Sequence, residues 1–181
     1  MYLNQLSTER LTIRPLQLED VKDWTAFFID NPNLKHLGIG KIDAKTAELY
    51  AKSWIEKQIW RYENNEYGHH ALILKETGKL VGQCGLLTQG FGDEKEIEVG
   101  YHMLPEYMQK GYATEAALAV RNFAFENNIT DSLISLIGID NEPAQKVAKK
   151  LSMKKDSRMK ANGMDVYIYQ INREEWEELQ K

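Results

Sequence analysis

The chain has 181 residues, carries 23 basic against 27 acidic side chains, and is 43% hydrophobic. A chain with this apolar content and modest net charge buries enough surface to fold, which excludes a disordered or low-complexity protein. No apolar run approaches the ~20 residues that a membrane helix needs, and residues 1–5 lack the charged and apolar regions of a signal peptide. We therefore expect one cytoplasmic domain of residues 1–181, built from helices and strands and without membrane contact.

The single cysteine, Cys84, cannot form an internal disulfide, and the Cys and His residues are not spaced as a zinc site. Cys84 is interpreted as a small buried hydrophobic residue, and no metal is expected. Residues 146–160 are rich in Lys and Arg, which is typical of a solvated face, with a local phosphate contact as the alternative. A nucleic-acid interface is not expected there, because no aromatic side chains for base stacking accompany the charges.

The first third of the chain predicts one strand and two helices. Residues 11–14 alternate in hydrophobicity and stop at Pro15, which indicates a strand. A helix follows from Glu19-Asp20 to about residue 31, and a longer one is predicted over about residues 46–64, where apolar residues recur at helical spacing. The aromatic residues of the longer helix, Trp54 among them, are interpreted as core side chains.

A hydrophobic period of two then predicts three strands in antiparallel series, over residues 71–74, 80–87 and 94–103. Turn signals at Thr77-Gly78 and at residues 90–92 separate them. The sequence therefore switches from helices to a sheet near its middle.

The C-terminal third predicts a helix, a buried strand, a second helix, a hairpin and a short acidic helix or frayed end. These elements are placed at residues 112–125, 133–139, 143–151, 154–171 and from Arg173 onward. The second helix carries Pro143, which fits only its first turn. The hairpin depends on Asn162-Gly163, a dipeptide typical of tight turns between strands.

The segment from Glu98 to Ala116 carries the most chemical information, because a strand there leads through a short loop into a helix. Gly111 and Ala113 stand at the helix start, where backbone N–H groups lack helical partners and the positive end of the helix dipole lies. Such a loop suits an anion such as a pyrophosphate; the alternative is a glycine that only lets the chain turn. The glycine spacings of a P-loop and of a dinucleotide-binding loop are both absent.

The same segment resembles the acetyl-CoA-binding core of the GNAT N-acetyltransferases, whose loop reads Gln/Arg-x-x-Gly-x-Gly/Ala, and in particular the RimJ/RimL-like branch. Residues 8–20 resemble that branch's opening strand and helix, residues 80–85 its central strand, and residues 141–151 its late Asn-x-x-Ser/Ala helix. The resemblance spans about residues 8–171. It implies an α/β GNAT fold, in which helices flank a mixed, mostly antiparallel sheet that splays between the strands near Met103 and Leu133 at the acetyl-CoA cleft.

The chain departs from the family pattern at several positions. Met108 stands where the loop often begins with Gln, Arg or Trp, and His102 stands where an aromatic residue is frequent. Ala148 stands where many GNAT enzymes carry a Tyr that protonates the departing thiolate, so the general acid stays unassigned. Ser152-Met153 replaces a common Gly-Phe, which is expected to alter only a turn and a packing contact.

The resemblance implies that acetyl-CoA is the co-substrate. It places the pantetheine arm along the backbone of Val99 and Tyr101, with one amide left to polarise the thioester carbonyl. Asn141 is expected at the pantetheine or its phosphates. The residues expected around the pyrophosphate are Gln109, Lys110, Gly111, Ala113 and Thr114.

Glu98 is the best candidate for the base that deprotonates an acceptor amine, acting directly or through a water. Its alternation with Glu94 and Glu96 is also typical of solvent-facing carboxylates on a half-buried strand. Family members commonly carry a β-bulge in this strand, which would turn Glu98 toward the cleft. Tyr101 is a candidate proton donor, with a packed aromatic residue as the alternative.

His69 and His70 open a strand near the expected acceptor cleft. As adjacent residues of a strand they point to opposite faces, so a joint metal site is not expected.

The expected reaction is direct acetyl transfer in a ternary complex, because no Cys or Ser is placed as a covalent nucleophile. An α-amine has a pKa of about 8, against about 10.4 for lysine, so a protein N-terminus or a small primary amine is favoured as acceptor. The acidic residues Asp93, Glu94 and Glu96 beside Glu98 leave a polyamine or aminoglycoside open.

Two further questions stay open in the sequence. A catalytically degenerate, acyl-CoA-binding sensor or interaction protein is compatible with the missing Tyr at position 148. The oligomeric state, monomer or homodimer, is not decided. Acceptor choice is expected to come from the first two helices and the terminal hairpin.

Overall fold

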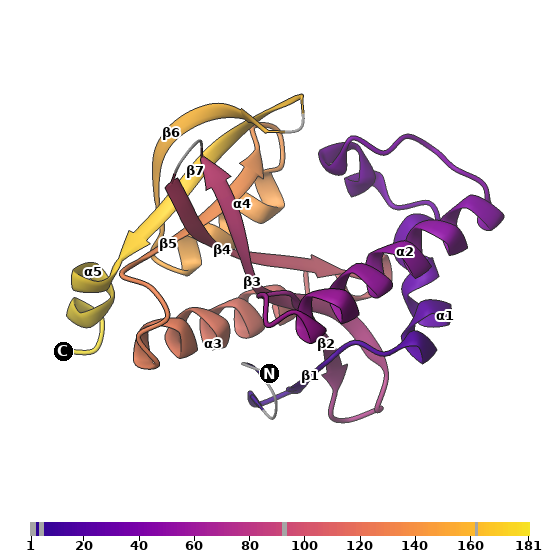
Figure 1. The fold of residues 1–181 in the computed structure, drawn as a ribbon, viewed down its shortest axis with the longest axis horizontal. Coiled ribbons are helices and arrows are strands. Elements are labelled where there is room, and N and C mark those ends of the chain that lie inside the picture. The colour runs from indigo at the N-terminus through magenta and orange to yellow at the C-terminus, as the bar shows by residue number, and fades with distance from the viewer. Residues whose placement is uncertain (1–2, 4–5, 92–93, 162) are drawn as a thin grey trace.

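The computed structural model describes the whole chain except residues 1–2, 4–5, 92–93 and 162. Within these described residues, one mixed sheet of seven strands has the order β1-β2-β3-β4-β5-β7-β6 (Figure 1). The strands are β1 (Leu11–Arg14), β2 (His69–Leu74), β3 (Leu80–Phe91), β4 (Glu94–Met103), β5 (Ser132–Gly138), β6 (Lys154–Ala161) and β7 (Met164–Asn172). Neighbouring strands are antiparallel except β4 and β5, which run parallel.

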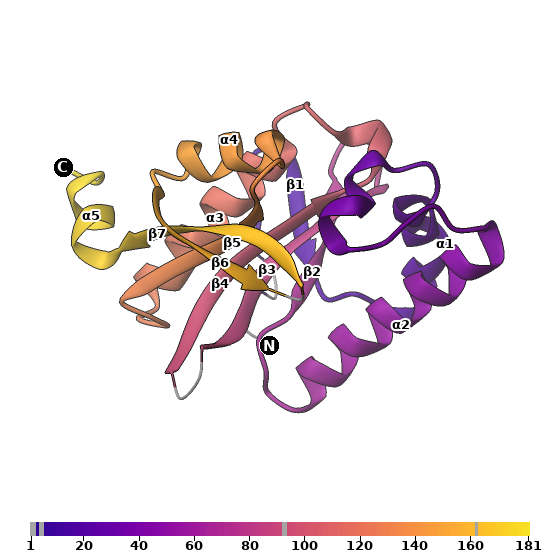
Figure 2. The same cartoon turned by 90° about the horizontal axis from the view of Figure 1, so that it is seen from above.

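Helices cover both faces of this sheet. The α-helices are α1 (Val21–Trp24), α2 (Ala44–Glu63), α3 (Tyr112–Glu126), α4 (Glu142–Lys150) and α5 (Arg173–Glu178). Short 3-10 helices lie at Leu18–Asp20, Thr25–Phe28, Pro32–Leu37 and Pro105–Tyr107. Figure 2 shows α3 and α4 on one side of the sheet and α1 and α2 on the other.

Each face has its own hydrophobic core. The larger core joins the sheet to α3, α4 and α5, through residues such as Val120, Leu151 and Trp176. The smaller core joins the other face to α1 and α2, through residues such as Trp24 and Ile55. The side chains of β4 divide between the two layers of helices: Val99 belongs to the larger core, and the ring of His102 lies 5.1 Å from that of Trp54 in α2.

The parallel contact between β4 and β5 is short, and this shapes the site. The two strands pair only at Ile97 with Leu133 and at Glu98 with Ile134. Beyond Glu98 the strand β4 remains paired with β3 up to Met103, while β5 remains paired with β7. The sheet is therefore split open from Glu98 onward, as the family resemblance implied.

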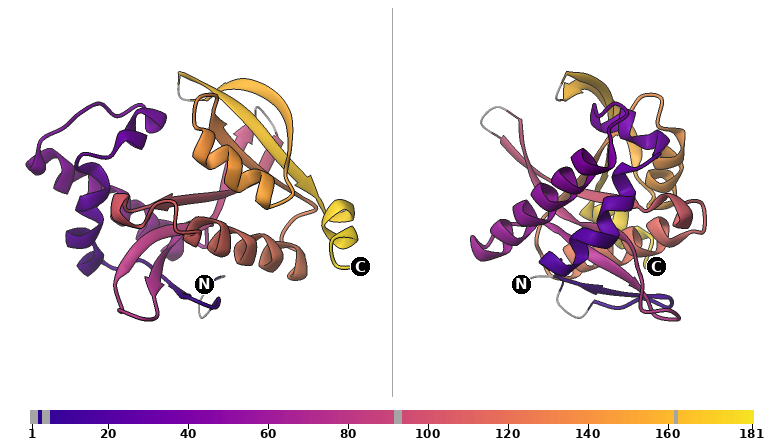
Figure 3. Two further views of the ribbon diagram at one scale, coloured as in Figure 1. Left: turned by 180° about the vertical axis from the view of Figure 1, so that it is seen from behind. Right: turned by 90° about the vertical axis from the view of Figure 1, so that its right-hand side faces the viewer.

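The strand β7 stays paired with β5 from Val166 to Asn172, and the tip of the β6–β7 hairpin extends past the end of β5 (Figure 3). Three residues near the tip of this hairpin, Ala161, Met164 and Val166, line the cleft. The tip reaches the chain that follows the 3-10 helix Pro32–Leu37, where the sulfur of Met164 lies 3.7 Å from the position that a Cβ atom on Gly38 would take. The hairpin was predicted from Asn162-Gly163; both strands are present, while Asn162 lies outside the described residues.

The predicted elements are confirmed in order and type, with three adjustments. The first predicted helix is only α1 followed by 3-10 turns, and the Thr25 hydroxyl donates to the Val21 carbonyl where the chain tightens. The strand β3 runs on to Phe91, so the expected turn at residues 90–92 begins later, and Gly92 lies outside the described residues.

The third adjustment concerns β4, where the expectation of a β-bulge is wrong. The pairing of β3 with β4 runs without a register shift from Gly82 with Met103 to Phe91 with Glu94.

Cys84 is buried, as predicted. No helix in the described parts of the chain has the length and apolar character needed to cross a membrane. The expectation of one domain over residues 1–181 stays a prediction.

Candidate active site

A cleft of about 990 Å³ follows the split between β4 and β5. One end is lined by residues 107–109 and 111–114 and by α4; we call it the loop end. The other end is lined by α2, the 3-10 helix Pro32–Leu37 and the tip of the β6–β7 hairpin; we call it the α2 end. Glu98 lies between the two ends, at the point where β4 and β5 separate.

The loop end is built from backbone. Gln109 and Gly111 both have positive φ angles, 61° and 85°, and Gly111 is the N-cap of the 15-residue helix α3. No side chain caps this helix start, so the first N–H groups of α3 stay available to a ligand. Gln109, Gly111, Ala113 and Thr114 all line the cleft. These are four of the five residues that were expected around a pyrophosphate.

Lys110, the fifth, does not line the cleft. Its ammonium lies 5.3 Å from the centre of the Tyr107 ring, and its carbonyl accepts a hydrogen bond from Arg10. Lys110 therefore contributes to this loop through its backbone and through packing on the outer side.

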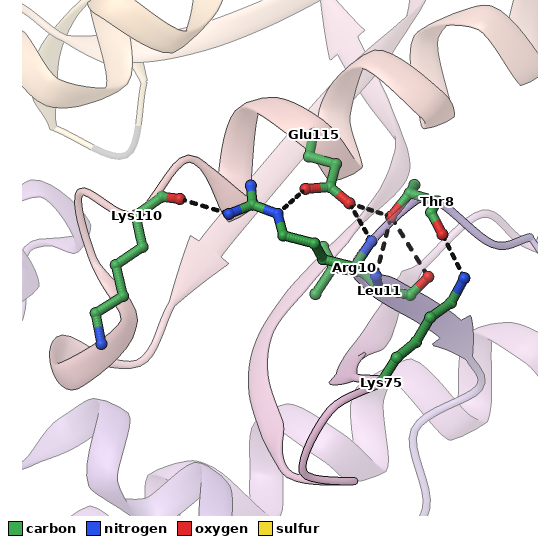
Figure 4. A network of polar contacts seen from close by, with 6 residues as sticks. All are labelled: Thr8, Arg10, Leu11, Lys75, Lys110 and Glu115. Carbon is green, nitrogen blue, oxygen red and sulfur yellow. Dashed lines mark hydrogen bonds and ion pairs between the residues drawn. The ribbon is translucent and has the colours of Figure 1, made fainter.

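Arg10, which precedes β1, holds the loop from behind (Figure 4). Its Nε donates to Glu115 Oε2 at 2.6 Å, its Nη1 donates to the Lys110 carbonyl at 3.1 Å, and its guanidinium lies 4.4 Å from the centre of the Tyr112 ring. Thr8 and the backbone N–H of Arg10 also donate to Glu115. One residue near the start of the chain thus contacts the loop, the first residue of α3 and a carboxylate of the first turn of α3.

Glu115 is ionised in this network. Partial burial disfavours its charge, but the hydrogen bonds from Thr8 and Arg10 outweigh that effect and lower the pKa of the carboxyl group. The ion pair of Arg10 and Glu115 lies on the outer side of the loop. The inner side, which faces the cleft, presents backbone N–H groups.

Two lysines of α4, Lys146 and Lys150, line the loop end beside Asn141. Asn141 caps α4, since its Oδ1 accepts from the N–H of Ala144 at 3.3 Å. Three other cations of the basic stretch are engaged elsewhere: Lys154 pairs with Glu175, Arg158 pairs with Asp165, and Lys155 lies over the Tyr167 ring. The stretch therefore contributes two cations to the cleft and does not form one continuous binding surface there.

Glu98 is only 8% exposed, so its interpretation as a solvent-facing carboxylate is wrong. Its Oε1 accepts from the N–H of Leu136 at 3.1 Å, and its Oε2 accepts from the side-chain amide of Gln89. The opening of the sheet, and not a bulge, gives the carboxylate its place, because β5 has left the ladder where Leu136 offers its N–H. Burial is the largest influence on this group and raises the pKa of Glu98.

The backbone next to Glu98 is turned toward the split. The hydroxyl of Ser135 donates to the Val99 carbonyl at 3.1 Å, so that carbonyl points toward β5. Backbone groups of alternate residues in a strand point to the same side, so those of Tyr101 also point toward β5, which by then has moved away. This is the region where the resemblance places a pantetheine arm.

The Tyr101 side chain fills the split toward α4, and its hydroxyl donates to the Ala144 carbonyl at 2.9 Å. Burial raises the pKa of this hydroxyl. Ala148 is fully buried in the core under α4, so that helix presents no hydroxyl at position 148. Both the roles expected of Tyr101, packing and proton donation, are compatible with this placement.

The α2 end is lined by polar and aromatic side chains. His69 is 3% exposed, and neither of its ring nitrogens has a hydrogen-bond partner. It stacks on Trp54 with ring centres 6.0 Å apart, and the ring of His102 lies 5.2 Å away. Burial lowers the pKa of His69 well below its ordinary value and that of His102 to about 4, so both rings are neutral at physiological pH.

Sequence reasoning placed His69 near the acceptor cleft but missed the cluster that it forms with Trp54 and His102. Trp54 lines the cleft and donates to Gln83 at 2.8 Å, so its interpretation as a plain core residue is incomplete. A signal was present in Gly100, in the middle of a strand, since an interior glycine often marks a close approach. A Cβ atom there would lie 2.5 Å from Nε2 of His69. Gln89 and Ser135 gave no signal in the sequence, because their contacts with Glu98 and with the Val99 carbonyl join different strands of the folded sheet.

Polar contacts connect the 3-10 helix Pro32–Leu37 to the turn that precedes α4. His36, in the 3-10 helix Pro32–Leu37, lies 3.1 Å from Asp140, and Lys35 lies 3.4 Å from the same carboxylate. Asp140 belongs to the turn between β5 and α4. The α2 end is therefore connected to the loop end by residues far apart in the sequence.

The sequence matches the family model described as the acetyltransferase (GNAT) domain over residues 10–154. YnaD of Bacillus subtilis (strain 168), described as an uncharacterized N-acetyltransferase, is 29% identical over 180 residues, which cover 94% of this chain and 98% of YnaD. The acetyltransferase of Agrobacterium tumefaciens is 26% identical, with a TM-score of 0.75 over 95% of this chain and 96% of that one.

A more distant structure is RimL, a ribosomal alpha-N-protein acetyltransferase solved in complex with coenzyme A. It is 12% identical, with a TM-score of 0.72, and the match covers 94% of this chain and 97% of that one, which shows a shared fold. The split sheet, the loop before α3 and the family match together define a GNAT acyltransferase. This chain belongs to the GNAT acetyltransferase family, and it is an N-acetyltransferase of the acetyl-CoA-dependent class.

Proposed function

We propose that the protein transfers the acetyl group of acetyl-CoA to a primary amine, either a protein N-terminus or a small amine, by direct attack in a ternary complex. The observation that carries this proposal is the buried Glu98 carboxylate at the junction of the loop end and the α2 end. A base is needed where the two substrates meet, and this is the one described carboxylate that lines the cleft.

The loop end fits the donor. Gly111 leaves space for a phosphate to approach the N–H groups at the start of α3, and its φ of 85° is a conformation that other residues adopt only with strain. Lys146 and Lys150 add positive charge where the phosphates of the donor would lie. Asn141 and the backbone of Val99 and Tyr101 would hold its pantetheine arm, and acetyl-CoA supplies the acetyl group as a thioester.

Glu98 would take the proton of the acceptor ammonium. Its raised pKa brings the carboxylate closer to the pKa of an α-amine, which improves proton transfer near neutral pH. The Leu136 N–H and the Gln89 amide orient the carboxylate, and neither competes for a proton, since both donate to it. A deprotonated amine is the nucleophile that the reaction needs.

Tyr101 would act on the leaving side as a hydrogen-bond donor. Its raised pKa disfavours loss of the proton, so the hydroxyl suits stabilisation of developing negative charge better than complete proton transfer. Its present bond to the Ala144 carbonyl holds the ring in the split.

Turnover of acetyl-CoA with three matched acceptors tests the proposal: a peptide with a free N-terminus, its N-blocked counterpart with an internal lysine, and spermidine. We expect the free N-terminus to react faster than the blocked peptide, because its amine loses a proton more readily. Faster turnover of the blocked peptide would reject this order of acceptors. Saturable acetyl-CoA binding without turnover of any amine would favour the acyl-CoA sensor instead.

Three further expectations stay predictions: the cytoplasmic location, the absence of nucleic-acid binding, and the choice between monomer and homodimer. The order of acceptors also stays a prediction until such assays are made.

A further inference from the structure

The helix α2 presents one stripe of side chains to the cleft. Tyr50, Trp54, Lys57 and Arg61 line it at spacings of four, three and four residues, which place them on one face of the helix. The first half of this stripe is aromatic and the second half is cationic. The cationic half, Lys57 and Arg61, lies on the wall of the α2 end.

These two cations have no acidic partner among the described residues. The described carboxylate that lines the cleft is Glu98, and it is already held by Gln89 and Leu136. The Nη1 of Arg61 donates to the neutral Gln58 side chain at 3.2 Å. On the outer face of α2, by contrast, Lys52 lies 3.8 Å from Glu56. The helix therefore pairs a charge outside and leaves two positive charges facing the cleft.

Arg61 acts electrostatically on the place of reaction. Burial raises the pKa of Glu98 and lowers that of His69, and the positive charge of Arg61 influences both groups. Arg61, Glu98 and His69 all line the cleft, so a substrate bound there meets the cation, the proposed base and the unpartnered imidazole together.

We propose that the acceptor is a primary amine that carries a carboxylate, and that Lys57 and Arg61 bind this carboxylate while the amine approaches Glu98. The inference rests on the proposed function and names its substrate class. The neutral ring of His69 has one donor and one acceptor free, which suits an uncharged group of the same substrate, such as a carbonyl or hydroxyl. An acidic N-terminal peptide and a free amino acid share this chemistry.

A polyamine or an aminoglycoside does not fit this wall, since its remaining charges would face Lys57 and Arg61. The acidic residues that favoured a polycation in the sequence do not offset this. Glu96 does not line the cleft, Asp93 and the side chain of Glu94 lie outside what the structure describes, and Glu98 is the proposed base.

The test measures kcat/KM for three peptide amides that differ only at their second and third residues, which are Glu, Gln or Lys. Free glutamate and spermidine are assayed beside them. We expect the Glu peptide to exceed the Gln peptide by about fivefold to tenfold at low salt, and the Lys peptide and spermidine to be slowest. If free glutamate is turned over as fast as the Glu peptide, the carboxylate belongs to an amino acid substrate. If free glutamate is turned over more slowly, the carboxylate belongs to a peptide substrate.

The variants Lys57→Gln and Lys57→Gln with Arg61→Gln are expected to reduce the ratio between the Glu and Gln peptides stepwise toward one. Lys52→Gln, on the outer face of α2, is the matched control and keeps the ratio. The single Lys57→Gln variant guards against misfolding, since Lys57 is exposed.

Equal or faster turnover of the Gln or Lys peptide by the wild type would overturn the inference and leave the proposed function in place, as would an unchanged ratio in the double variant. No turnover of any amine, with acetyl-CoA still bound, would overturn the proposed function and this inference with it.

Discussion

The two ends of the cleft are built by different means. The loop end uses backbone N–H groups at the start of α3, and Arg10 and Glu115 hold that loop from outside. The α2 end uses side chains from α2, β2, β4 and the 3-10 helix Pro32–Leu37, and it contains polar atoms without partners, such as both ring nitrogens of His69.

This difference matches what each end would bind. A pyrophosphate needs many donors in fixed positions, which a helix start supplies with little help from side-chain identity. An acceptor is distinguished from its competitors by side chains whose hydrogen bonds only the right partner completes. We therefore expect binding at the loop end to depend on backbone geometry. Binding at the α2 end should depend on side-chain chemistry.

The largest expected effect lies where the two ends meet. Glu98→Gln keeps the shape of the side chain and removes its basicity, so kcat should fall by roughly 10²–10⁴ while the affinity for acetyl-CoA is kept. Steady-state kinetics and titration calorimetry measure the two quantities. Glu96→Gln is the matched control, because Glu96 shares this face of β4 without lining the cleft. A kcat within twofold of the wild type in Glu98→Gln would remove the base assignment.

The next effect concerns only the loop end. Gly111→Val places a branched side chain at φ 85° beside Arg10, and acetyl-CoA affinity should fall about tenfold to a hundredfold. Gly78→Val is the control, since Gly78 has φ 68° in an open turn away from the cleft. Both variants should lose thermal stability, and only the first should lose affinity. A similar loss of affinity in both would assign the effect to the fold.

A smaller effect is expected from the contacts behind the loop. Arg10→Gln and Glu115→Gln should each weaken acetyl-CoA binding by about fivefold, with little further loss in the double variant, because the two side chains act as one unit. The KM for the acceptor should stay unchanged. Arg14, in β1, pairs with Asp20 in the 3-10 helix Leu18–Asp20, and Arg14→Gln should lower stability without changing this affinity. Additive losses from Arg10 and Glu115 would argue against a shared positioning role.

The smallest predicted effect is on stability. The pKa of Glu98 is raised in the folded state above its ordinary value of 4.5. The contribution of protonated Glu98 to the free energy of unfolding is therefore complete below pH 4.5 and is lost as the pH rises through the folded-state pKa. Glu98→Gln should therefore melt at a higher temperature than the wild type at pH 7–8, with the difference vanishing near pH 4. Equal melting temperatures at pH 8 would mean that the charge is solvated.

The two ends also differ in how much of them the sequence predicts. The strand, the glycine loop and the start of α3 are consecutive in the chain, so the family resemblance could name the loop residues one by one. All of them except Lys110 line the cleft, and their role at a pyrophosphate stays a prediction. Glu98 was found by its position in the strand, but the reason for its burial lies in the departure of β5, which is a property of the sheet.

The rest of the site could not be predicted in the same way. Arg10 contacts Glu115 across 105 positions of the chain, and Leu136 contacts Glu98 across 38. His69 and Trp54 meet through the packing of α2 on the sheet, which no local pattern encodes. Contacts between distant segments depend on register and on the helix position, so residue type alone does not identify them.

The most direct test of the account is the pH dependence of kcat/KM for a peptide with a free N-terminus, measured for the wild type and for Glu98→Gln at saturating acetyl-CoA. The wild-type profile should rise with pH as Glu98 ionises, above the usual range of a carboxyl group, because the ionised carboxylate takes the proton of the bound ammonium. The variant lacks this base, so its profile should rise only as the amine itself ionises, at about 8, and at a lower rate. An identical profile in the two proteins would contradict the claim that Glu98 accepts the proton.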